Sequence, residues 1–176
     1  WMAQAFEFKR GQRFIHAWNQ TPMGYGLPAA IGAHYATGKR IILVTGDGSI
    51  MVNVGELATI RGLPIKIILF NNLGHAMCRQ SQREWLGGVY PSTSIEGGLR
   101  FPDFIRLGEA HDIDSFNINI NPRFYLESML RHDRPCLLEA KIDPDCDVVP
   151  KVKYPNPNEM MYPLLPEEEQ SANMLI

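Results

Sequence analysis

Two short apolar runs, each followed at once by polar residues, constrain the fold of this chain more than any other feature. Residues 40–45 and 64–70 are dominated by β-branched and other apolar side chains, which is typical of strands buried on both faces. Residues 54–61 between them are compatible with a helix, which Gly62 and Pro64 would end. A strand, a helix and a second strand in this order form a right-handed crossover between parallel strands. We therefore expect a parallel sheet.

The rest of the chain up to residue 142 continues this alternation. Residues 28–37 are small and apolar, and they predict a buried helix that leads into the first strand. Further helices are expected over 101–110 and 122–132, each followed by a strand, over 112–118 and 135–142. The expected fold class is α/β, a three-layer αβα domain with a mainly parallel sheet.

Two segments do not fit the alternation. Residues 86–98 are rich in Gly, Ser and Pro, so they predict a long loop, which is either a lid or binding loop or an ordinary flexible connection. From Asp143 onward the chain becomes Pro-rich, and we expect an arm without regular structure there. The prolines concerned are Pro144, Pro150, Pro155, Pro157, Pro163 and Pro166.

Charge and cysteine content exclude several functional classes. The 176 residues carry 17 Lys and Arg against 19 Asp and Glu without a basic cluster, so nucleic-acid binding is not expected. Cys78, Cys136 and Cys146 lack metal-ligand spacing and are odd in number, which favours a reducing, cytoplasmic location. No apolar run approaches the roughly 20 residues of a membrane helix, and the first residues do not resemble a signal peptide.

Polar residues follow both strands of the first crossover directly. Residues 46–49 read Gly-Asp-Gly-Ser, and residues 71–72 are both Asn. Because the carboxyl ends of parallel strands meet at one edge, the carboxylate of Asp47 and the carboxamide of Asn72 should converge. One acid and one neutral oxygen suit Mg²⁺, which completes its octahedron with phosphate and water. The glycines would let backbone approach a phosphate closely, and a helix starting near Ser49 adds a favourable dipole.

Each half of this pattern has an ordinary structural alternative. Gly-Asp-Gly at 46–48 is a common turn, and paired asparagines are common in loops because Asn tolerates unusual backbone angles. The two halves together, each behind a buried strand, favour a metal and diphosphate site.

These motifs resemble the thiamin-diphosphate motif of 2-oxo acid decarboxylases and carboligases. The resemblance rests on residues 46–49, 56–59 (Glu-Leu-Ala-Thr), 63–66 (Leu-Pro-Ile-Lys) and 71–72. Residues 23–32 (Met-Gly-Tyr-Gly-Leu-Pro-Ala-Ala-Ile-Gly), 101–107 and 163–166 resemble the acetolactate synthase catalytic subunit. The resemblance extends from about residue 19 to about residue 166. It implies a thiamin-diphosphate-binding fold in which residues 1–18 end an interdomain linker, 19–142 form the diphosphate-binding domain and 143–176 form a Pro-rich C-terminal arm.

The resemblance also implies roles for individual residues. Asp47 and Asn72 would bind Mg²⁺ through side-chain oxygens, with the backbone carbonyl of Gly74 as a third ligand. Met23 would lie beneath thiamin diphosphate and impose its bent shape, although core packing is an alternative role; His75 would contact the diphosphate or cap a helix. The implied cofactor-binding residues are Thr21, Met23, Gly46, Asp47, Gly48, Ser49, Asn72, Gly74, His75, Ala76 and Met77, and the implied substrate-pocket residues are Gln80 and Ser81.

Four positions depart from the family pattern. Thr21 and Pro22 replace the usual Gly-Thr or Gly-Ser before the methionine, and Ala76 stands where Gly is usual. Ser81 replaces the tryptophan that shapes the acceptor pocket of acetolactate synthases. Acetolactate formation is therefore not expected, and the resemblance is to acetolactate-synthase-like enzymes of sugar-nucleotide pathways, which use larger acceptors.

The family's activating glutamate is expected outside this chain, on a pyrimidine-binding domain of the same or a second chain. The catalytic residue is therefore not assigned. The resemblance implies a thiamin diphosphate-dependent lyase or transferase that acts on a 2-oxo acid, is incomplete as this chain alone and forms homo-oligomers. The alternatives are a simple decarboxylase subunit of the phosphonopyruvate or sulfopyruvate type and a non-catalytic cofactor-binding domain.

Overall fold

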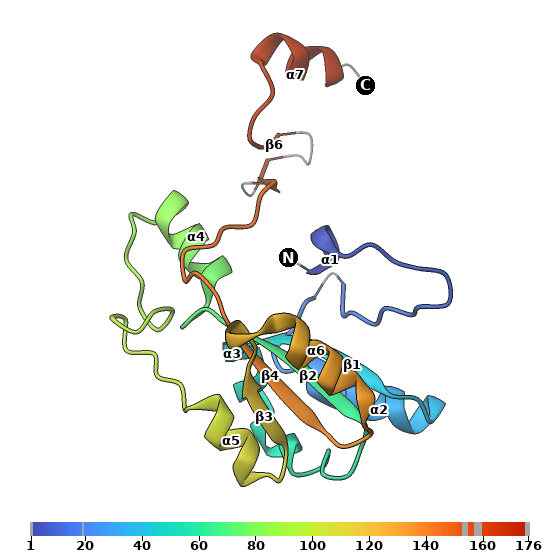
Figure 1. The fold of residues 1–176 in the computed structure, drawn as a ribbon. Coiled ribbons are helices and arrows are strands. Elements are labelled where there is room, and N and C mark those ends of the chain that lie inside the picture. The colour runs from blue at the N-terminus through green and yellow to red at the C-terminus, as the bar shows by residue number, and fades with distance from the viewer. Residues whose placement is uncertain (1, 19, 153–154, 157–159, 175–176) are drawn as a thin grey trace. The chain divides into compact units, whose positions relative to one another are not determined.

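A computed structural model describes residues 2–18, 20–152, 155–156 and 160–174. The chain divides into two compact units, Trp1–Asp145 and Cys146–Ile176. The first unit contains a four-stranded parallel sheet in the order β1-β2-β4-β3 (Figure 1). Its strands are β1 (Ile41–Gly46), β2 (Ile65–Asn71), β3 (Asp114–Asn117) and β4 (Cys136–Lys141). The predicted α/β class with a mainly parallel sheet is confirmed.

Helices cover both faces of this sheet, which gives the expected three layers (Figure 1). The first face packs against α2 (Gly26–Thr37), α3 (Asp47–Val52) and α5 (Phe104–Ala110), and the second packs against α6 (Pro122–Arg131). Leu43, Ile67 and Leu137 are adjacent across three strands and are buried on the first face. Side chains at alternate strand positions point to opposite faces, so both faces of the central strands need apolar residues. That requirement explains the continuous apolar runs in the sequence.

The connection between β1 and β2 differs from the prediction. The helix expected over 54–61 is wrong: α3 starts directly after β1, and only a 3₁₀ turn, η1 (Val54–Leu57), follows it. Asn53 separates the two with φ −125°, outside the helical range, and its side-chain amide donates to the Gly24 carbonyl at 2.9 Å. This contact far along the sequence outweighs the helix propensity of the segment.

Helix α2 is only partly buried, which corrects the prediction of a buried helix. Leu27 and Ala30 are buried against the sheet, whereas Tyr35 is 70% exposed. Because α2 is apolar on all sides, its sequence does not indicate which face packs inward.

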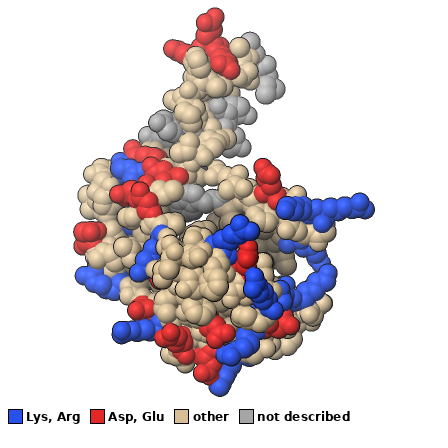
Figure 2. Space-filling view, in the orientation of Figure 1, with Lys and Arg blue, Asp and Glu red and all other residues tan. Residues whose placement is uncertain are grey.

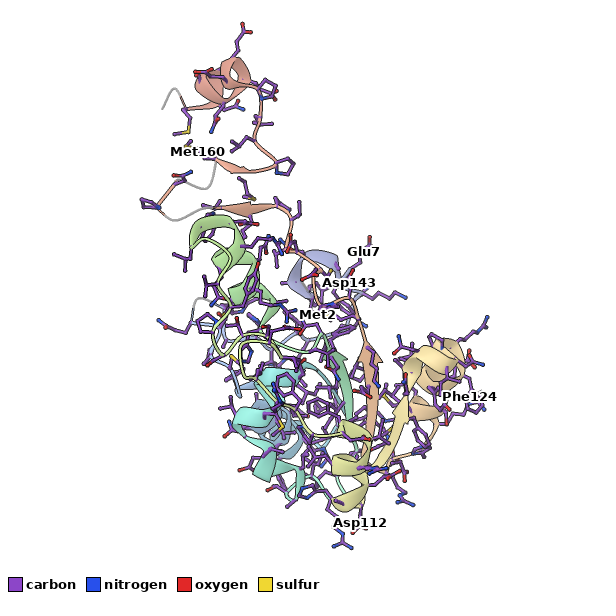
Figure 3. The ribbon with its side chains drawn as sticks, turned by 90° about the vertical axis from the view of Figure 1, so that its left-hand side faces the viewer. Met2, Glu7, Asp112, Phe124, Asp143 and Met160 are labelled. Atoms are coloured by element: carbon purple, nitrogen blue, oxygen red, sulfur yellow. The ribbon has the colours of Figure 1, made fainter. Side chains whose placement is uncertain are left out.

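Residues 76–85 form α4 (Ala76–Trp85), which leads into residues 86–98. Residues 86–98 contain no helix or strand, as expected. The remaining elements of this unit are short: α1 (Met2–Ala5) and η2 (Ile118–Ile120). Asp112 and Asp143, labelled in Figure 3, lie before β3 and after β4, and so mark the amino and carboxyl ends of the parallel sheet.

The second unit does contain regular structure, which corrects the expectation for the Pro-rich arm. Strands β5 (Lys151–Val152) and β6 (Met161–Tyr162) pair in antiparallel fashion, and α7 (Glu167–Asn173) follows. Pro166 precedes α7, and three glutamates occupy its first turn, where negative charge favours a helix. Pro157 and its neighbours 158–159 lie outside the described residues. The prolines that the structure describes lie outside these elements, which is why the arm still accommodates them.

Acidic and basic side chains alternate over the face shown in Figure 2, without a large area of one sign. None of the described helices combines the length and apolarity needed to cross a membrane. Cys78, Cys136 and Cys146 are all free.

Candidate functional site at the carboxyl edge of the sheet

The polar residues that follow β1 and β2, among them Asp47 and Asn72, form what we call the polar edge. Asp47 lies at its centre. It follows β1 directly, and its residue is only 2% exposed. The carboxylate Oδ1 accepts from the Gly48 amide at 2.6 Å, and Oδ2 accepts from the amides of Asn72 and Gly74, each at 3.1 Å. Amide donors from both strand ends therefore converge on one carboxylate. The crossover spacing predicts that Asp47 and the Asn72 carboxamide converge, and the contact that Asn72 makes with Asp47 is through its backbone amide.

Burial and hydrogen bonding act on the Asp47 carboxyl group in opposite directions. Burial raises its pKa above the ordinary value of 3.8, while the amide donors of Gly48, Gly74 and Asn72 and the nearby His75 lower it. Burial is the largest of these effects, so the net direction is upward. A buried carboxylate with a raised pKa favours a bound cation, because a cation offsets the cost of burying the negative charge.

Residues 72–74 form a tight turn directly after β2. Leu73 has φ 57°, in the left-handed region that branched side chains rarely adopt. Asn72 is half-buried, and within the described chain its side-chain amide makes no hydrogen bond, so its oxygen is available to a ligand. A carboxylate, a free amide oxygen and backbone from this turn are oxygen donors that suit Mg²⁺, so these residues fit the implied metal.

A second set of contacts holds the segment with Met23 against the crossover. Gly24 donates its amide to Ser49 Oγ at 3.1 Å, and its carbonyl accepts from the Asn53 side chain. Gly24 has φ 85°, and a Cβ there would lie 2.7 Å from Val52 Cγ1. Glycine is therefore required for this close approach. Asn53 was not predicted as a site residue.

Gly48 lies beneath the side chains of two predicted site residues. A Cβ at Gly48 would overlap the ring of His75 and would lie 3.1 Å from Met23 Cε. The side chains of Met23 and His75 therefore both lie close to Gly48. Gly46, two residues earlier in the chain, is the last residue of β1. His75 also precedes α4, but its side chain forms no cap hydrogen bond there.

Thr21 has φ 37°, a left-handed conformation that is unfavourable for a β-branched residue. The resemblance implies Gly at this position, and Gly adopts positive φ without strain. The substitution therefore keeps the backbone conformation but adds strain.

Helix α4 separates the remaining predicted residues between two faces. Ala76 and Gln80 are buried, Gln80 to 3% exposure, whereas Met77 is 52% exposed. Ser81 lies one turn after Met77 and donates to its carbonyl at 3.1 Å. Met77 and Ser81 thus share the open face, while Gln80 points into the unit.

Two polar residues that the sequence did not single out complete this edge. Glu139 is 4% exposed and accepts from the Asn71 side chain at 2.6 Å, which ties β4 to the end of β2. Arg79 is buried in α4 and donates to the carbonyls of Asn72 and Leu73. Both residues contact partners that are distant in sequence or belong to the backbone, so no local motif indicates them.

An apolar rim borders this polar edge. Met23, Tyr25, Leu73 and Met77 are 46%, 40%, 47% and 52% exposed, respectively. Exposed large apolar side chains close in sequence to the residues of a polar site are typical of a surface that another domain or a ligand covers.

Comparison with known proteins identifies the family. The sequence matches the family described as thiamine pyrophosphate enzyme, C-terminal TPP binding domain, over residues 1–140. It is 35% identical over 180 residues to the acetolactate synthase large subunit of Porphyra purpurea, covering 99% of this chain and 28% of that protein. The isozyme 2 large subunit of Escherichia coli (strain K12) is 33% identical over 99% of this chain and 30% of its own length.

A solved structure of a thiamine diphosphate-dependent enzyme also resembles this chain. The thiamine diphosphate-dependent 4-hydroxybenzoylformate decarboxylase of Rhodococcus jostii RHA1 matches with a TM-score of 0.62 and 26% identity, over 69% of this chain and 23% of that one. The chain thus spans less than a third of the length of each of these relatives. It belongs to the thiamine pyrophosphate enzymes, as the C-terminal TPP-binding domain of an acetolactate-synthase-like member.

Proposed function

We propose that this chain binds the Mg²⁺-diphosphate end of thiamin diphosphate in a 2-oxo acid decarboxylase or carboligase. The observation that carries the proposal is the buried Asp47 carboxylate, which three backbone amides from two strand ends hold in place. Asp47, Asn72 and the Gly74 carbonyl would bind the metal. Gly48, Ser49, His75 and Ala76 would lie against the diphosphate, and Gly46 would be a further cofactor-binding residue. When bound, the cofactor supplies the carbanion chemistry that releases CO₂ from a 2-oxo acid.

The chain's own residues would orient the cofactor and exclude water. Met23 lies over Gly48 and beside His75, where it can support the cofactor from below. The Thr21 backbone would contact the aminopyrimidine, and Met77 would line the opposite side of the pocket. Binding energy used for such placement lowers the barrier by holding the reacting groups in position.

The activating carboxylate would come from a pyrimidine-binding domain, either in the same polypeptide or in a partner chain, within a homo-oligomer. The exposed rim of Met23, Tyr25, Leu73 and Met77 supports this proposal, because a facing domain would cover it. The location would be cytoplasmic, and the free cysteines support this part of the proposal.

The acceptor would be larger than pyruvate, as in sugar-nucleotide pathways. Ser81 supports this proposal because it lies on the open face of α4 beside Met77, where a tryptophan would fill space. The test is the product ratio with pyruvate as donor: Ser81→Trp should shift the products towards acetolactate. Efficient acetolactate synthesis by the unmodified enzyme would contradict the proposal.

A simple decarboxylase is the second candidate. The structural relative from Rhodococcus jostii RHA1 is named a decarboxylase, which favours this reading. Supplying a range of aldehyde and 2-oxo acid acceptors with pyruvate separates the two: a carboligase forms a new carbon-carbon bond with one of them, whereas a decarboxylase releases only the aldehyde.

The metal proposal is tested by isothermal titration of thiamin diphosphate into the protein together with its pyrimidine-binding domain. Binding should require Mg²⁺ and should disappear on addition of a chelator. Equal binding with and without the metal would refute the assignment of Asp47 and Asn72.

A further inference from the structure

Arg79 is a buried cation whose hydrogen bonds to the described residues all go to main-chain carbonyls. The residue is 7% exposed. Its Nη1 donates to Leu73 at 3.3 Å and to Thr93 at 3.5 Å, and its Nη2 donates to Asn72 at 3.2 Å and to Pro144. Across the described residues, no acidic side chain forms an ion pair with it.

Burying the Arg79 guanidinium in this way costs free energy of folding, unless its hydrogen bonds hold other parts of the chain in place. The exposed Glu96 is close enough to interact electrostatically with Arg79, but among the described residues it forms no ion pair with the guanidinium. Burying a cation without a counter-charge in contact is unfavourable, and the buried Nε of Arg79 has no hydrogen-bond partner among the described atoms. An apolar side chain would fill this position of α4 at less cost. The carbonyls that Arg79 contacts belong to three separate segments, so its bonds fasten these segments together.

The first of these segments is the turn that carries the candidate metal ligands. Leu73 is strained at φ 57°, and a strained residue persists only where its surroundings hold it. Arg79 contacts the carbonyls of both Asn72 and Leu73, which fixes the peptide planes on either side of the strained residue. The same turn directs the amides of Asn72 and Gly74 to Asp47.

The second segment is the long loop 86–98. Its Thr93 carbonyl accepts from Arg79 and, at 3.0 Å, from the His75 amide, and its hydroxyl donates to Gln82 at 2.6 Å. Thr93 and Ser94 are buried. A Cβ at Gly74 would overlap both the Arg79 guanidinium and the Thr93 carbonyl, so turn, arginine and loop are in close contact. The loop is therefore fastened to the turn and is not a loose surface connection.

We propose that Arg79 is a positioning residue that couples the order of loop 86–98 to divalent metal binding by the turn 72–74. This inference rests on the proposed metal site at Asp47 and Asn72. Arg79 does not touch the metal or the cofactor; it holds the strained turn in the conformation that presents the ligands. Displacement of the loop at Thr93 removes one of the carbonyls that fix the guanidinium of Arg79. The hydrogen bonds from Arg79 to the turn 72–74 are weakened as a result.

The experiment measures Mn²⁺ as a probe for the Mg²⁺ site, by electron paramagnetic resonance, in holoprotein that contains both cofactor-binding domains. Arg79→Met should raise the Kd for Mn²⁺ about tenfold, at the lower end of the effect of removing a residue that supports a metal ligand. Arg79→Lys should give a smaller rise, because one ammonium group cannot span three segments. Arg106→Met is the matched control, since Arg106 is exposed on α5, and it should leave the Kd unchanged.

A second variant loosens the loop and leaves Arg79 intact. Thr93→Val removes the hydroxyl bond to Gln82 while keeping the side-chain shape. We expect a two- to threefold rise in the Kd for Mn²⁺, about the effect of one neutral hydrogen bond. Should Arg79→Met fail to fold, Arg79→Lys and Thr93→Val decide the question: an unchanged Kd in both overturns the proposal.

Hydrogen exchange of the metal-free protein separates this proposal from the proposed function. The His75 amide, which donates to Thr93, should exchange at least about tenfold faster in Arg79→Met than in the unmodified protein. Faster exchange with unchanged Mn²⁺ affinity would leave Arg79 as a structural residue only and overturn the coupling. Failure of the unmodified protein to bind Mn²⁺ would instead refute the proposed function, and the exchange result would still report on the fastening of the loop.

Discussion

The polar edge around Asp47 and the apolar rim around Met23 lie side by side but differ in how complete they are. Asp47 is 2% exposed and already has three amide donors, whereas Met23 is 46% exposed and Met77 is 52% exposed. The hydrogen bonds of the polar edge are thus already formed within this chain, whereas the rim is exposed in the part of the chain that the structure describes. Under the proposed function, this difference would place the affinity for the diphosphate end within this domain and would make catalytic placement depend on a second domain.

Removing the carboxylate should have the largest effect. Asp47→Ala should lower the Mg²⁺-dependent affinity for thiamin diphosphate by on the order of 100-fold or more, since even residues that support a ligand contribute 10- to 100-fold. Asn72→Ala should lower it by about tenfold, because a neutral oxygen contributes less than a charged one. Isothermal titration measures both. Asp133→Asn, at an exposed position, serves as the control, and an unchanged affinity in Asp47→Ala would remove the basis of the comparison.

Truncating the rim should separate binding from turnover. Met23→Ala should lower kcat by about tenfold, because misplaced reacting groups lose part of the rate gained from orientation. The affinity for the Mg²⁺-diphosphate end should change by less than about threefold, since Met23 is no part of the polar edge. Steady-state kinetics and titration on the same preparation give the two values. Equal losses in both would mean that edge and rim act as one unit.

The pH dependence of stability should distinguish the metal-free from the metal-bound edge. The pKa of Asp47 is raised in the fold, so its contribution to stability is fully present below 3.8 and is lost as the pH rises through the folded-state pKa. Bound Mg²⁺ should reverse this loss by compensating the ionised carboxylate. Urea unfolding between about pH 4 and about pH 7, with and without Mg²⁺ and thiamin diphosphate, measures the difference. Asp47→Ala should abolish the part of the pH dependence that the metal changes.

Relief of backbone strain should have the smallest effect. Thr21→Gly should stabilise the protein by about 1 kcal/mol, because glycine adopts the φ of 37° without the clash of a β-branched side chain. Thr37→Gly, in the last turn of α2, should have the opposite sign, since glycine weakens a helix. Thermal unfolding of both variants provides the test. A destabilised Thr21→Gly would indicate that the threonine side chain makes contacts that outweigh the strain.

Much of the fold and of the polar edge could be predicted from the sequence, because both depend on local patterns. The first two strands begin and end within one residue of their predicted limits, since buried parallel strands leave continuous apolar runs. The convergence of Asp47 with the residues after β2 follows from strand order alone. The helix expected to start near Ser49 is α3, which begins at Asp47. The helix expected over 54–61 is only the 3₁₀ turn η1, and the bond between Asn53 and Gly24 that precedes it is not visible in local propensity.

Residues whose hydrogen-bond partners are distant in the sequence were not predicted. Arg79 contacts the carbonyls of Thr93 and Pro144, and Glu139 meets Asn71 across two strands. A single sequence does not reveal such partners, because main-chain carbonyls are present at every position. The exposure of α2 could not be predicted either, since an evenly apolar helix has no preferred inner face.

The uninterrupted course from β1 through α3 to β2 also bears on how such proteins diversify. The Asp47 carboxylate and its three amide donors all lie between residues 47 and 74, so one contiguous stretch of coding sequence specifies the whole arrangement. Recombination that joined this stretch to new flanking segments, or divided a gene outside it, would leave these four residues together. The arrangement of Asp47 and its three amide donors can therefore be kept in both fused and split genes, while the surfaces around it change independently.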